Sequence, residues 1–256
     1  MTSEAGHVRV AIEGSLARVT LSHPGKFNAM SRAMWRELKT VFVDLQARTD
    51  VRCVVVVGEG GHFCAGGDIA EYPDFRFQEA ALREFHEDDV WGGLGAMLAC
   101  DLPLLAQIEG NCMGAGVEIA SCCDIRVASA SARFGAPIAK LGFPMAPREA
   151  ALVAREAGAA TAREILLEAT VFDAAEMKAR GFLNTVLPDG TLTTAVLARA
   201  QRIASLSPQA ARLNKQALRA TQGSTVADGD GAYRYADSAE HREGIAAFIA
   251  KRPPVF

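Results

Sequence analysis

The feature that most constrains this chain is a run of small residues between a buried strand and a helix, residues 110–118. The apolar segment 104–108 before it has the composition of a buried strand, and residues 119–121 continue as a helix. Small residues let a ligand approach the backbone closely, and a helix start carries unpaired N–H groups at its positive end. The turn therefore predicts a site for negative charge that develops on an oxygen, with Glu118 placed to move a proton beside it.

A second turn of similar character, residues 63–69, follows the strongest strand signal in the chain, residues 53–57. Two such turns, if folding brings them together, can each supply one backbone N–H to the same oxygen. Preorganised donors of this kind are what an oxyanion hole requires.

The rest of the pattern predicts an α/β protein. It begins with a β-hairpin that turns at residues 13–15, and Ser31 is placed to cap the first helix. Further helices are expected at 32–48, 78–99, 148–157, 160–168, 174–180, 192–205, 208–221 and 228–250, and further strands at 124–128 and 184–187. The change of composition near 188–190 divides the chain into an α/β core, residues 1–190, and a C-terminal helical region, residues 191–256.

Composition narrows the classes of function. A net charge of -3 gives no basic field for nucleic acid, and no apolar run approaches the length that spans a membrane. The N-terminus has no signal-peptide pattern, so a cytoplasmic protein is expected. The six cysteines form no C-x-x-C pair and are interpreted as buried free thiols, with no metal site.

At this point the residues resemble a known family, the crotonase superfamily, also called the enoyl-CoA hydratase/isomerase family. The resemblance rests on segments 63–69 and 108–120 and covers essentially the whole chain in the expected order. Its supporting motifs are His23-Pro24, Asn28-Ala29, Cys123-Asp124 and the ending 251–256. The resemblance implies a spiral of β-β-α units, with a C-terminal helical region that builds trimers or dimers of trimers. It also implies an acyl-CoA thioester substrate, as in fatty acid metabolism, and no cofactor beyond the coenzyme A of the substrate.

Placed residue by residue, the family's two oxyanion-hole donors fall on the backbone N–H groups of Ala65 and Ala115. The first of the two glutamates that hydratases use falls on Glu118. The position of the second is occupied by Ile138, which is the main departure from the family pattern. If its side chain faces the pocket, His86 is a candidate to take the role of the missing acid.

The resemblance also marks the residues expected to contact the substrate. They are Lys26, Ala29, Ala65, Gly66, Gly67, Asp68, Ile69, Gly114, Ile138 and Lys251. A simple helix cap is the favoured interpretation of Asp68, and Lys26 is as readily a solvated loop lysine. The segment 75–91 is expected to roof the acyl pocket. Asp124 is interpreted as structural, and Arg148 and Glu149 as a solvated first helical turn.

The expected function is an enzyme that adds water to a 2-enoyl-CoA with one glutamate as acid and base. Double-bond isomerisation, dehydration, decarboxylation and thioester hydrolysis remain open on the same scaffold, because chemistry resides in the pocket residues. An acyl-CoA-binding protein that has lost catalysis with Ile138 is the alternative of another class.

Overall fold

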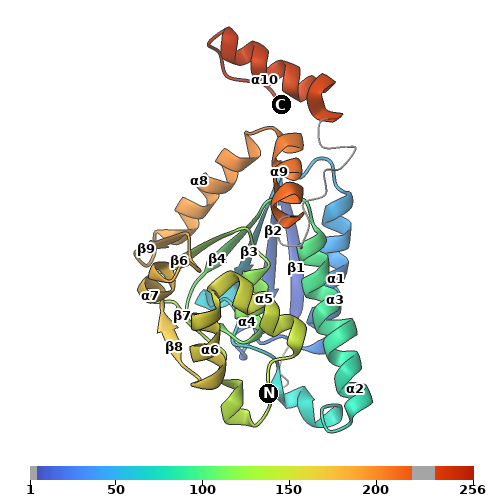
Figure 1. Ribbon diagram of the computed structural model, residues 1–256, viewed down its shortest axis with the longest axis vertical. Coiled ribbons are helices and arrows are strands. Elements are labelled where there is room, and N and C mark those ends of the chain that lie inside the picture. Colours follow the sequence, from blue (N-terminus) through green and yellow to red (C-terminus); the bar gives the residue numbers. More distant parts are fainter. Residues whose placement is uncertain (1–4, 221–233) are drawn as a thin grey trace.

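The computed structural model describes residues 5–220 and 234–256, and a six-stranded sheet lies at its centre (Figure 1). The first two strands are antiparallel, and every later neighbour in the sheet is parallel. In spatial order the strands are β1 (His7–Glu13), β2 (Leu16–Ser22), β3 (Cys53–Gly58), β4 (Leu104–Ile108), β6 (Ile125–Ser129) and β9 (Thr185–Leu187). Parallel strands need crossover connections, which is why helices separate them along the sequence.

The sheet is covered on both faces, which explains why its central strands are apolar without alternation. On one face lies α8 (Leu192–Ala204), and on the other α1 (Arg32–Ala47), against which α3 (Trp91–Ala99) packs. Along β3, Val54 and Val56 belong to the main core shared with α1 and α3, whereas Cys53 and Val55 lie under α8. Successive side chains point to opposite faces, so each face receives alternate residues of the strand.

A small second sheet holds the glycine-rich turn before the short helix α4 (Ala115–Ser121). Its strands are β5 (Asn111–Met113), β7 (Arg133–Gly135) and β8 (Val171–Asp173). The sequence analysis placed β5 in a turn and missed β8, because strands of three residues are too short to show a period.

Four of the other expected helices are confirmed to within one or two residues, namely α5 (Pro147–Ala157), α6 (Ala159–Leu167), α7 (Ala174–Ala179) and α9 (Pro208–Ala220). Two more are present with other bounds, α2 (Glu79–Glu84) and α10 (Ala239–Ile249). Short helical turns complete the described chain, namely η1 (Glu59–Gly61), η2 (Ile69–Asp74), η3 (Phe85–Val90), η4 (Pro137–Leu141) and η5 (Arg234–Asp237). The helix expected at 78–99 is present, but it contains the π-helical turn η3.

The helix expected at 228–250 lies partly outside the described residues, and its described part begins only at α10. Ser238 has extended backbone angles and its side chain accepts from the N–H of His241, so it caps the helix there. In Figure 1, α10 lies beyond α9 at the end of the molecule farthest from the central sheet. The boundary predicted at residue 190 precedes α8, which nevertheless packs on the sheet as part of the core.

The six cysteines are free and buried, as expected. Among the described residues no helix is long and apolar enough to cross a membrane.

Candidate active site

The two glycine-rich turns meet in the folded chain. Cys64 and Cys112 form an isolated parallel bridge, in which the N–H of Met113 donates to the Cys64 carbonyl at 2.8 Å. Gly66 and Gly114 then lie face to face with positive φ angles of 119° and 48°. A Cβ atom on Gly114 would lie 3.6 Å from the Cα of Gly66. That distance is an ordinary contact, so glycine is needed here for the backbone angles.

Backbone N–H groups at this junction differ in whether they are already used. The N–H of Ala65 donates to the Phe27 carbonyl at 3.0 Å, so the donor that the sequence analysis placed on Ala65 is occupied. The N–H groups of Gly67 and Ala115 have no acceptor among the described residues. The positive φ of Gly66 turns the chain between Ala65 and Gly67, which accounts for the different directions of their N–H groups. The free pair of donors is therefore Gly67 and Ala115.

A cavity of about 220 Å³ opens at these two turns. Eight of the residues that the resemblance marked line it, namely Ala65, Gly66, Gly67, Ile69, Gly114, Ala115, Glu118 and Ile138. Trp35, Val90, Met145 and Leu141 add apolar wall, so the cavity combines a few polar groups with a mostly apolar surface. Such a lining is typical of small-molecule sites.

The other expected substrate-binding residues lie outside the cavity lining. Lys26 and Asp68 form an ion pair at 2.6 Å, and the Asp68 side chain also accepts from the Ala70 N–H as the cap of η2. Ala29 is buried behind the turn. Lys251 follows α10, the helix that lies farthest from the sheet in Figure 1, and it is not part of the cavity lining. It therefore does not reach the cavity of its own chain, because the helix before it projects away from the core.

Glu118 lies on the first turn of α4, and its side chain lines the cavity. Burial, and then the negative charge of Glu149, raise the pKa of the Glu118 carboxyl to about 8 from an ordinary 4.5. At neutral pH this carboxyl therefore carries a proton, and it accepts no hydrogen bond from the described residues. It has the properties of a general acid.

The interpretation of Glu149 as a solvated helix residue is wrong. Its side chain is only 3% exposed, and Oε1 lies 3.2 Å from the Nδ1 of His86. His86 faces inward from η3 and lines the cavity with Glu118. The neighbouring Arg148 is exposed and pairs with Glu87, as a solvated residue does. Sequence reasoning missed Glu149 because the first turn of an amphipathic helix carries a glutamate equally often for its dipole, and only the neighbours on other elements distinguish the two cases.

The expected roof over the cavity is confirmed and begins slightly earlier than the sequence suggested. Tyr72, Arg76, Phe85 and His86 line the cavity from η2, η3 and the loop that joins them through α2. Burial raises the pKa of Tyr72 to about 12, so its phenol keeps its proton. The roof packs through edge-to-face aromatic contacts, among them Tyr72 with Phe143 at 5.9 Å between ring centres.

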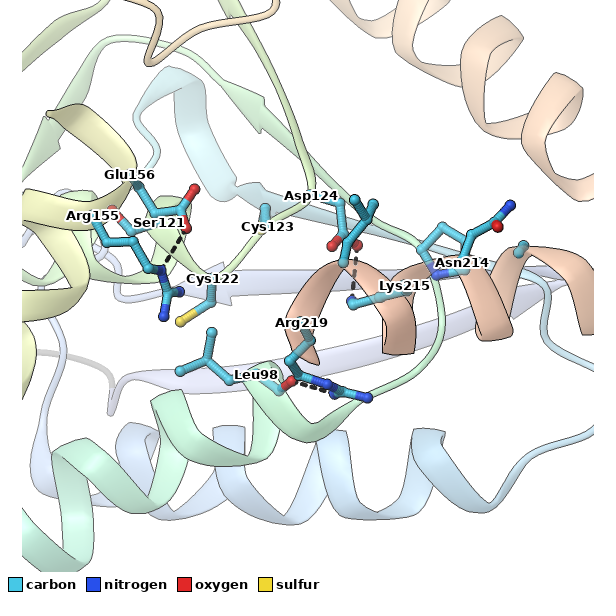
Figure 2. A pocket seen from close by; sticks show the side chains of 13 residues that line it. Leu98, Ser121, Cys122, Cys123, Asp124, Arg155, Glu156, Asn214, Lys215 and Arg219 are labelled. Carbon is cyan, nitrogen blue, oxygen red and sulfur yellow. Dashed lines mark hydrogen bonds and ion pairs between the residues drawn. The ribbon is translucent and has the colours of Figure 1, made fainter. Parts of the chain in front are cut away.

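A second and larger cavity, of about 450 Å³, lies between α9 and the ends of α3, α4 and α5 (Figure 2). Its charged groups are mutually paired, with the Lys215 ammonium 2.8 Å from the Asp124 carboxylate and Arg155 against Glu156. The Asp124 carboxylate also accepts from the Leu104 N–H, which confirms its structural role. This cavity offers neither a free backbone donor pair nor an unpaired acid, so the chemistry belongs to the smaller cavity.

Comparisons with known proteins agree with this geometry. The model of the Enoyl-CoA hydratase/isomerase family matches residues 11–256. A probable enoyl-CoA hydratase of Mycobacterium tuberculosis is 31% identical over 93% of each chain, and the 2,3-dehydroadipyl-CoA hydratase of Escherichia coli is 30% identical over 93% of each. The crystal structure of an enoyl-CoA hydratase/carnithine racemase from Magnetospirillum magneticum superposes with a TM-score of 0.94 at 36% identity, covering 99% of this chain and 96% of that one. The chain therefore belongs to the enoyl-CoA hydratase/isomerase family.

Proposed function

We propose that this protein adds water across the double bond of a 2-enoyl-CoA thioester. The observation that carries the proposal is the buried Glu118 carboxyl, whose pKa burial raises to about 8, beside two N–H donors without an acceptor among the described residues. The N–H groups of Gly67 and Ala115 would hold the thioester oxygen as it gains negative charge. Donors fixed in place before the reaction stabilise this enolate without reorganisation.

Protons are divided between two groups in this mechanism. Water bonds to Cβ and loses a proton to the free Nε2 of His86, while the π electrons move through Cα toward the thioester oxygen. Glu118 then gives its proton to Cα, and the proton on His86 returns to Glu118 to complete the cycle. Glu149 orients His86 through Nδ1, as a carboxylate does for a catalytic imidazole. Glu149 and His86 would thus do the work of the glutamate that Ile138 replaces.

This chemistry requires no metal or redox group, since coenzyme A arrives as part of the substrate. Asp68 belongs to the turn 63–69, and Lys26 pairs with it. Both would contact the coenzyme A portion of the substrate there. The buried free cysteines fit a reducing compartment such as the cytoplasm.

The C-terminal region supports a further part of the proposal, assembly into trimers or dimers of trimers. Phe248, Ile249 and Val255 are at least 75% exposed on and after α10. Exposed apolar residues grouped at one end of a chain mark a contact surface. In such an assembly Lys251 would approach the cavity of a neighbouring copy.

The deciding experiment follows the mass of the products in deuterated water. The protein is incubated with 2-enoyl-CoA and 3-enoyl-CoA thioesters, and we expect a water mass to be added to the 2-enoyl substrate only. Glu118→Gln should abolish this addition, because the amide cannot donate the required acid proton. Interconversion of the two isomers without added water would replace the proposal by an isomerase, and binding without turnover would replace it by an acyl-CoA-binding protein.

A further inference from the structure

Arg76 is a cation that lines the active-site cavity, and it has no anionic partner in the part of the chain that the structure describes. It is the only lysine or arginine among the described residues of the cavity lining. Its guanidinium makes no hydrogen bond or ion pair with a described side chain, whereas neighbouring Arg32 and Arg148 pair with carboxylates. Burial lowers its pKa, and Tyr72 is the only titratable group that acts on it.

The guanidinium is nonetheless held in place. Its central carbon lies 3.8 Å from the ring centre of Phe143 and 4.4 Å from that of Tyr72. Cation–π contact with these two rings, whose planes cross at 70°, orients the group and leaves N–H donors for an anion. A half-buried cation that is fixed in this way is already desolvated and oriented for an incoming anion.

The location of Arg76 identifies which part of a substrate it would meet. Phe143 belongs to the loop that follows η4, and Ile138 lies in η4 itself. Both side chains line the cavity. Tyr72, one of the two rings that contact Arg76, lines the same cavity as Glu118. Lys26, the cation beside the other turn, is already neutralised by Asp68.

We propose that Arg76 binds a carboxylate at the far end of the acyl chain, so that the preferred substrate is the coenzyme A monothioester of an unsaturated dicarboxylic acid. The proposal rests on the proposed hydration, and it adds the chemical class of the acyl group. Arginine matches a carboxylate with two parallel N–H···O bonds, and a neutral chain would leave the guanidinium unpaired in the cavity. The site therefore binds the carboxylated chain more tightly and the neutral chain more weakly.

The test compares two substrates with equal carbon number, hex-2-enedioyl-CoA and hex-2-enoyl-CoA. We expect the wild-type protein to hydrate the carboxylated substrate with the higher kcat/KM. Arg76→Gln should lower that value by about 10- to 100-fold, the effect of losing a charged hydrogen-bond pair, and leave the neutral substrate nearly unchanged. Arg76→Lys keeps the charge without the paired geometry and should fall between. Arg148→Gln is the matched control, because that arginine is exposed and does not line the cavity.

Two outcomes overturn the inference. An equal loss for both substrates in Arg76→Gln would place the guanidinium on the coenzyme A portion that they share. A wild-type preference for the neutral chain that Arg76→Gln leaves intact would remove its role in selection.

Binding separates failure of this inference from failure of the proposed reaction. If neither substrate gains water, the saturated pair adipyl-CoA and hexanoyl-CoA is titrated by calorimetry. Tighter binding of adipyl-CoA that Arg76→Gln abolishes would support the carboxylate site in a protein of different chemistry. Equal affinity for the two thioesters would contradict it.

Discussion

At the scale of single residues, Glu118 links stability to pH in an unusual direction. Its pKa is about 8 in the folded protein and near 4.5 when exposed, so between these values the folded state binds a proton that the unfolded state has lost. The contribution of this group to the free energy of unfolding therefore decreases as pH rises from about 4.5 to 8. Glu118→Gln should remove this slope and should be more stable than the wild type at pH 8. Urea unfolding at pH 5 and pH 8 measures the difference, and parallel pH curves for the two proteins would contradict it.

The same carboxyl sets the upper pH limit of activity. If Glu118 acts as the acid that protonates Cα, kcat/KM should decline as pH rises through about 8, because the carboxyl then loses its proton. Substrate affinity measured at the same pH values is the control, since it separates loss of the acid from loss of binding. A rate that stays constant to pH 9 would assign the acid role to another group.

At the scale of elements, the contact between the two turns is the feature on which the site depends. A Cβ on Gly116 would lie 2.6 Å from the Cys64 carbonyl oxygen, a backbone atom that cannot move alone. Gly116→Ala should therefore force α4 away from the first turn, at a cost of roughly 1–3 kcal/mol in stability and most of the activity.

Gly95→Ala is the matched control for that substitution. Gly95 lies within α3, and its nearest contact for a new Cβ is an ordinary 3.8 Å from Trp91. It should stabilise the protein by about 0.5–1 kcal/mol, because alanine loses less backbone entropy in a helix. Thermal unfolding and hydration rates of the two variants test the contrast, and equal effects would show that the turn contact is not critical.

In the proposed mechanism the second acid–base group comes from η3 and α5 and not from η4, where Ile138 lies. Glu149→Gln should lower kcat by roughly 100-fold, the usual contribution of a positioned acid–base group, and change KM little. Glu87→Gln, an exposed position on η3, should leave kcat unchanged. Adding Ile138→Glu to the Glu149→Gln variant should restore part of the rate. An unchanged kcat in Glu149→Gln would limit Glu149 to a structural role.

At the scale of the whole molecule, the exposed apolar residues on and after α10 form the proposed contact between copies, which would also bring Lys251 near the cavity of a neighbouring copy. Phe248→Asp combined with Ile249→Asp should dissociate the proposed trimer, because charge at an apolar contact leaves unpaired ions to be desolvated. Sedimentation velocity measures the change in mass, and circular dichroism confirms that the core remains folded. A wild-type protein that sediments as a monomer at all concentrations would exclude the assembly.

The sequence by itself determined the α/β class, the order of most elements and the character of the two glycine-rich turns, because these follow from local periodicity and from glycine. It also placed Glu118 correctly on the first turn of α4. That the two turns meet was decided by the tertiary structure, through the bridge between Cys64 and Cys112. Only the tertiary structure decided which N–H groups remain free, since Phe27 uses that of Ala65 from a distant loop. It alone placed Glu149 beside His86 and left Arg76 without a carboxylate among the described residues, because burial and pairing depend on side chains that come from elements far apart in the sequence.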